Sequence, residues 1–91
     1  MKLVVAFDGG DTIEVDAGWP EVLRLERFTG IPYPELAERG FVGTPYRLAW
    51  LALQRAEHPS VLPHYDLRVA PAVFMDAGAE ELASVATVEF G

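Results

Sequence analysis

The stretch that decides the fold is TPYRLAWLALQRAEH, at residues 44–58. It begins with Thr44 and Pro45, a pair that favours a helix start, because threonine can cap the first turn and proline fits its first position. Pro59 then prevents the helix from continuing. Apolar residues cover more than half of the circumference, which is wider than the stripe of an ordinary surface helix. We therefore expect a central helix at 44–58 that other elements cover on most sides.

On a helical wheel, the residues of this helix that face inward are Tyr46, Leu48, Ala49, Trp50, Ala52, Leu53 and Ala56. The remaining polar arc carries Arg47, Gln54, Arg55 and His58, with Leu51 among them. A single exposed leucine is common on protein surfaces and needs no function. An apolar side chain among charged ones can also mark a protein contact. Leu51, Arg47 and Arg55 are therefore candidate partner-binding residues.

Residues 2–16 are expected to form a β-hairpin around a glycine turn. A two-residue loop would place Val5 opposite Glu14 and mix apolar with acidic side chains on one face. A three-residue loop, Asp8-Gly9-Gly10, gathers Leu3, Val5, Phe7, Ile13 and Val15 on one face. We expect the second register, with Gly10 in the left-handed conformation.

Two short helices are expected between the hairpin and the central helix, over residues 20–28 and 34–39. Each begins at a proline and ends before a glycine, as helix starts and stops commonly do. The residues expected to face the core are Val22, Leu25 and Phe28 in the first helix and Leu36 and Ala37 in the second. The residues of the first helix expected to face water are Glu21, Arg24 and Arg27. Trp19, just before the first helix, either packs over the helix start or contacts a partner, and it is the fourth candidate partner-binding residue.

Prolines and a glycine interrupt the pattern of residues 61–91, so only helical turns are expected there, within 71–75 and 79–84. Residues 85–90 have the composition of a strand and either extend the hairpin or form a tail. The expected fold class is α+β in a single domain at 1–91. It comprises an N-terminal β-hairpin followed by a small helical domain with one central helix.

Composition excludes several classes of function. The net charge of −7, with scattered basic residues, argues against a nucleic-acid partner, because phosphate binding depends on clustered lysine and arginine. The longest nearly uncharged apolar run, Leu48 to Leu53, is far shorter than the roughly 18–20 residues that cross a membrane. The absence of cysteine excludes a disulfide framework and a thiolate site, and it agrees with a cytoplasmic protein. A chain of 91 residues buries a small core, which favours partner binding or a homo-oligomer.

The sequence offers little equipment for catalysis. Neither Ser60 nor Ser84 lies in a Gly-x-Ser-x-Gly turn beside a base. His58, His64 and Asp66 are spaced so that they do not share one helix face, which argues against a metal site. We therefore expect no enzymatic activity, no metal and no cofactor.

Three segments carry a family resemblance: the hairpin at 2–15, LRLERF at 23–28 and RLAWLALQR at 47–55. In this order they resemble the tail assembly chaperones of long-tailed, siphovirus-like bacteriophages, particularly those that infect actinobacteria. None of these motifs is catalytic. The likeness ends with the central helix, since Pro71 and Gly78 depart from the family's usual C-terminal pattern.

The resemblance implies a non-enzymatic protein in the host cytoplasm that binds the tape measure protein and keeps that long hydrophobic chain in solution. It also implies assistance to the tail tube subunits that polymerise around the tape measure protein. Two other interpretations stay open. One is an acidic antitoxin or inhibitor-type module that binds a protein, and the other is a small structural adaptor of the virion.

Overall fold

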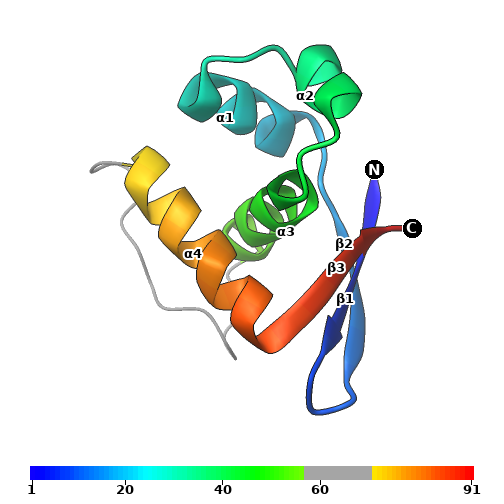
Figure 1. The fold of residues 1–91 in the computed structure, drawn as a ribbon. Coiled ribbons are helices and arrows are strands. Elements are labelled where there is room, and N and C mark those ends of the chain that lie inside the picture. Colours follow the sequence, from blue (N-terminus) through cyan, green and yellow to red (C-terminus); the bar gives the residue numbers. More distant parts are fainter. Residues whose placement is uncertain (57–70) are drawn as a thin grey trace.

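A three-stranded antiparallel sheet and a set of helices make up residues 1–56 and 71–91, which the computed structural model describes (Figure 1). In chain order the elements are β1 (Lys2–Phe7), β2 (Thr12–Asp16), α1 (Trp19–Thr29), α2 (Tyr33–Arg39), α3 (Gly43–Arg55), α4 (Pro71–Val85) and β3 (Ala86–Phe90). The fold class is α+β, as predicted. Four residues considered above for catalysis or metal binding lie outside the described residues: His58, Ser60, His64 and Asp66.

The hairpin of β1 and β2 has the predicted three-residue loop at residues 8–10. Leu3 lies opposite Val15, and this register places the apolar side chains of both strands on the face that meets the helices. Gly10, which ends the loop, has a φ of 100°, a conformation that glycine adopts without steric cost. Both the register and the glycine conformation are confirmed.

The last strand, β3, pairs antiparallel with β1 on the side opposite β2, so the strand order is β2-β1-β3. The interpretation in which residues 85–90 extend the hairpin is therefore confirmed. Alternation along the strands buries one face: Leu3 and Val5 are fully buried, and Val88 is 4% exposed.

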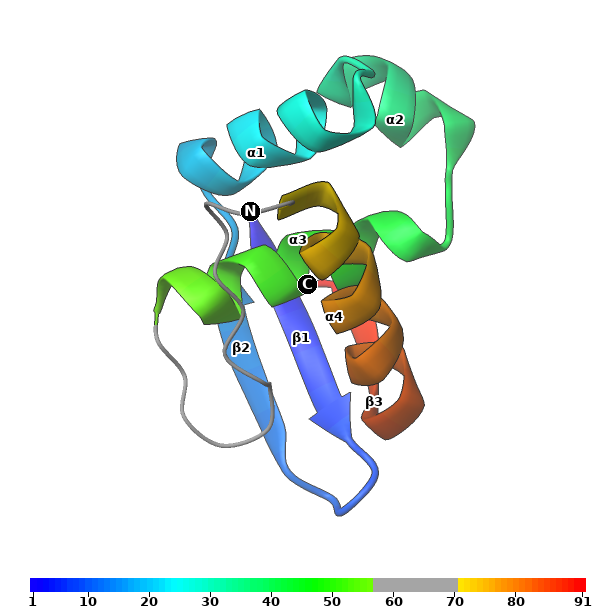
Figure 2. The ribbon, with the colours of Figure 1, turned by 90° about the vertical axis from the view of Figure 1, so that its left-hand side faces the viewer.

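The central helix is α3, which contacts all three strands, α1 and α4. Figure 2 shows it crossing the sheet, with α1 above it and α4 in front. Its bounds differ from the prediction, because Val42 rather than Thr44 is the N-cap and the helix ends at Arg55 rather than at 58. Thr44 is instead buried in the first turn, and Ala56, predicted to face the core, is exposed.

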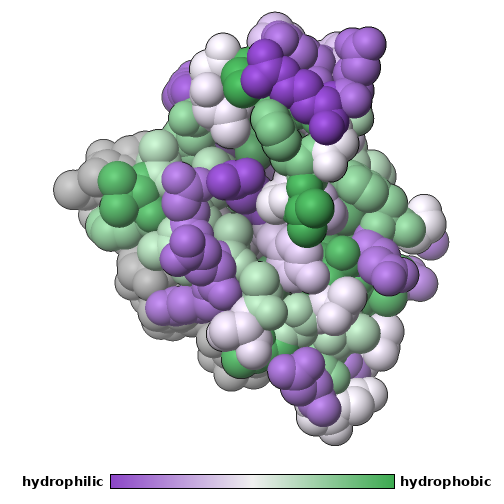
Figure 3. Space-filling model, viewed as in Figure 1, coloured by the Kyte–Doolittle hydropathy of each residue, from purple (hydrophilic) through white to green (hydrophobic). Residues whose placement is uncertain are grey.

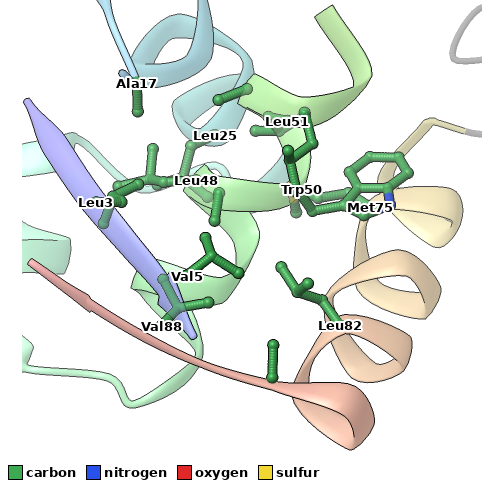
Figure 4. Packing of buried hydrophobic residues seen from close by; sticks show 14 of the residues in the cluster. Leu3, Val5, Ala17, Leu25, Leu48, Trp50, Leu51, Met75, Leu82 and Val88 are labelled. Atoms are coloured by element: carbon green, nitrogen blue, oxygen red, sulfur yellow. The ribbon is translucent and has the colours of Figure 1, made fainter. Parts of the chain in front are cut away.

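The prediction that Leu51 is exposed is wrong. Every residue from Leu48 to Leu53 is buried, and Leu51 is only 2% exposed. Leu51 lies near Leu25 of α1 in Figure 4. The helix α1 thus packs against the side of α3 that the helical wheel assigned to solvent.

The helix α4 is continuous from Pro71 to Val85, although two separate helical turns were expected. Gly78 lies in its middle, against the indole ring of Trp50. A Cβ atom at Gly78 would overlap the indole nitrogen and its ring neighbours, at distances that real side chains do not show. The glycine therefore makes room for Trp50, which is fully buried and lies beside Met75 between α3 and α4 (Figure 4).

The two short helices lie close to their predicted bounds, and each ends at a glycine with positive φ, Gly30 and Gly40. Two side chains differ from the prediction. Glu21, expected to face water, is 1% exposed, because its carboxylate turns back to accept a bond from the Gly18 amide at 2.8 Å. Ala37, expected to face the core, is exposed. The helix α2 has only 7 residues, and Leu36 alone among them is buried.

Candidate protein-binding surface

Large apolar side chains remain exposed in the part of the chain that the structure describes. The most exposed are Val42 at 82%, Trp19 at 73%, Val73 at 66%, Phe90 at 53%, Phe41 at 43% and Leu23 at 42%. Single exposed apolar residues are normal on protein surfaces, whereas apolar residues gathered around a hollow are typical of interaction sites. A candidate interaction site therefore requires several of these residues to lie together.

Two adjoining hollows gather several of these residues between the end of α1, the α2–α3 linker, the start of α3 and α4. The first has a volume of about 510 Å³, and its apolar lining residues are Phe28, Ile31, Leu36, Phe41, Val42 and Met75. The second has a volume of about 370 Å³, and its apolar lining residues are Val42, Tyr46, Ala79 and Ala83. Both hollows are also lined by Gly43, Arg47 and Asp76. Because they share these residues and Val42, we describe them together as the trough.

An ion pair joins α3 to α4 in the trough. The Nε atom of Arg47 donates to Oδ1 of Asp76 at 3.0 Å, with the two side chains 32% and 58% exposed. Gly43 leaves space for this arrangement, since a Cβ there would lie 2.8 Å from a terminal guanidinium nitrogen of Arg47. At this exposure the pair adds little stability. Its main consequence is to hold the Arg47 guanidinium against the protein, within reach of a bound partner.

A second region lies at the start of α1. Trp19 and Leu23 are four residues apart, so both side chains lie on one exposed side of that helix. Between them in sequence, Glu21 points inward, and its Oε1 forms an ion pair with Nε of Arg55 at 3.0 Å. The carboxylate is 2% exposed and the arginine 59%, so Arg55 ties the end of α3 to the start of α1.

The four candidate residues do not form one surface. Arg47 lies in the trough, at the start of α3. Arg55 lies eight residues further along α3, or about 12 Å, where it pairs with Glu21 near Trp19 at the start of α1. Leu51 is buried between the two arginines and is not available to a partner in this structure. The helical wheel placed Arg47, Leu51 and Arg55 together on one polar arc. In the structure α1 packs at the Arg55 end of that arc, so the three side chains do not share one exposed surface.

Sequence reasoning missed the trough. Its most exposed apolar residue, Val42, lies with Phe41 in a linker of three residues between α2 and α3. The available signal was this pair of large apolar residues between Gly40 and Gly43, where linkers are usually polar. In Figure 3, hydrophobic surface over the first half of α4 and the start of α3 is interrupted by hydrophilic residues.

The described residues offer little for chemistry. Residues 1–56 and 71–91 contain no group of three or more histidines, aspartates or glutamates that could hold a metal ion. Ser84 donates its hydroxyl to the carbonyl oxygen of Glu81 at 2.6 Å, a local bond within α4. Over the same residues, no helix combines the length and the apolar character that crossing a membrane requires.

Comparison with known proteins returned no match: no family model, curated protein or solved structure is similar to this chain.

Proposed function

We propose that this chain is a non-enzymatic protein-binding domain and, more specifically, a tail assembly chaperone that binds the tape measure protein of a long-tailed phage. The observation that carries the first part is the trough, in which Val42 is 82% exposed beside an apolar lining. The second part rests on the resemblance of the hairpin and of the helices at 23–28 and 47–55 to that family.

The exposed side chains favour a protein partner over a small molecule. Small-molecule sites enclose most of their ligand, whereas here the exposed residues extend beyond the hollows to Val73 and, on α1, to Trp19. Tryptophan is among the residues that contribute most to protein interfaces. A surface of this kind suits a large apolar chain that needs cover before assembly.

The acidic charge supports the same proposal. A net charge of −7 repels other copies and keeps an assembly factor dispersed while it covers an apolar client. It also favours encounter with clients that carry basic residues. In this proposal the chain acts in the host cytoplasm, binds the tape measure protein, and is released as tail tube subunits polymerise.

Co-expression with the tape measure protein tests the proposal directly. The fraction of tape measure protein in the supernatant should rise with the wild-type chain. Trp19→Ser should reduce this rise and Trp19→Phe should preserve it, because phenylalanine retains an apolar ring at a site where the side chain is 73% exposed. No gain from the wild-type chain would refute the chaperone. Recovery of the chain in purified particles would favour the virion adaptor instead.

A further inference from the structure

We propose that the trough binds one amphipathic helix of the partner, which places two apolar side chains on either side of Val42 and a lysine or arginine beside Glu80. This inference rests on the proposed function only in requiring a protein partner. It adds the location of the site and the chemistry of the segment that occupies it.

The shape of the trough suits side chains spaced as on a helix. Val42 lines both hollows, together with Gly43, Arg47 and Asp76, so it stands at the boundary that the hollows share. It is also the most exposed large apolar residue of the described chain. On a helix, residues three or four apart project side by side, about 5–6 Å from one another. Two such apolar residues can fill neighbouring hollows on either side of a single valine.

The walls of the trough favour a helix over an extended peptide. They are built from residues of α1, α2, α3, α4 and the linkers on either side of α2, and none of the residues in the described strands lines them. An extended segment would place its amide and carbonyl groups against these walls without a strand edge to pair with. A helix satisfies those groups internally and presents only its side chains.

The charges around the trough specify the polar side of the partner helix. Arg47 and Asp76 neutralise each other through their ion pair. Glu80, the third charged lining residue, is exposed and takes part in none of the ion pairs among the described residues. The lining therefore carries one unbalanced negative charge within a chain of net charge −7. A cationic side chain complements it, whereas a second copy of this acidic chain does not.

Two labelled peptides provide the probe for the full chain. The first is a synthetic helix of about 14 residues with leucines at positions i, i+4 and i+7 and lysines beside them, and the second replaces those lysines with glutamate. Fluorescence anisotropy should show that the lysine peptide binds at least about tenfold more tightly than the glutamate peptide.

Substitutions then locate the site. Val42→Asn should weaken binding of the lysine peptide about tenfold, because a polar amide must be desolvated where the valine made apolar contact. Val42 is 82% exposed in the free protein, so this variant should keep its fold. Val73→Asn is the matched control, since Val73 is 66% exposed but does not line the trough, and it should bind as the wild type does.

A second pair of variants, one in the trough and one outside it, tests the role of charge. Glu80→Lys should reverse the preference between the two peptides, whereas Glu89→Lys makes the same charge change on β3 and should leave it intact. Absence of binding by the lysine peptide, or equal binding by the two valine variants, would overturn the proposal. A change of oligomeric state in Val42→Asn without peptide binding would also overturn it and assign the trough to a second copy. Peptide binding without rescue of the tape measure protein would retain the site and remove only the chaperone.

Discussion

Gly78→Ala should destabilise the protein, although the same change in a helix interior normally stabilises it. Alanine is favoured over glycine in a helix by about 1 kcal/mol. Here the added Cβ would overlap the indole of Trp50, which is fully buried. Overpacking of this kind costs roughly 1–3 kcal/mol or more. The overlap is severe, because it involves the indole nitrogen and two neighbouring ring carbons, so the cost lies at the upper end of this range. We expect a net loss of about 2 kcal/mol, or a fall in Tm of roughly 8–16 °C at about 4–8 °C per kcal/mol.

A double-mutant cycle with Trp50→Leu isolates the contact. Leucine leaves space beside Gly78, so in that background Gly78→Ala should recover the ordinary helix preference and stabilise the protein by up to about 1 kcal/mol. Urea denaturation followed by far-UV circular dichroism measures all four variants without depending on tryptophan fluorescence. A stabilising effect of Gly78→Ala in the wild-type background would refute the packing of α4 on Trp50.

Two further predictions concern burial. Leu51→Ala should cost about 2–5 kcal/mol and Leu51→Asp should prevent stable folding, because the side chain is 2% exposed. A loss of less than about 1 kcal/mol for Leu51→Ala in denaturant unfolding would show that the side chain is exposed instead. Glu21→Gln should cost about 1–3 kcal/mol, because it weakens the hydrogen bond that the carboxylate accepts from the Gly18 amide and removes the ion pair with Arg55. An unchanged thermal melt would show that these contacts contribute nothing to stability.

Local patterns in the sequence predicted much of the fold. The hairpin register followed from alternating apolar residues and a loop that ends in Gly10, both of which act over a few residues. The positions of α1 and α2 followed from prolines and glycines in the same way. These patterns depend only on residues close in sequence, so the packing of distant elements does not change their effect.

The errors arose where distant residues decide the outcome. Leu51 is buried because α1 covers it, and a helical wheel contains no information about α1. Gly78 disfavours a helix locally, yet α4 runs through it. A glycine at this position leaves room for the indole of Trp50, which is distant in sequence. The trough depends on how the linker at 40–42 lies against α1 and α4, which no local pattern determines.

The strand order β2-β1-β3 has a consequence for how this chain folds during its synthesis. β1 is made first and occupies the middle of the sheet, while its second neighbour, β3, is the last of the described elements to leave the ribosome. Until then one side of β1 offers unpaired amide and carbonyl groups to any other chain nearby. Closing so long a loop is also slow, because contacts distant in sequence form late. The nascent chain therefore exposes an unpaired edge of β1 until β3 has been synthesised.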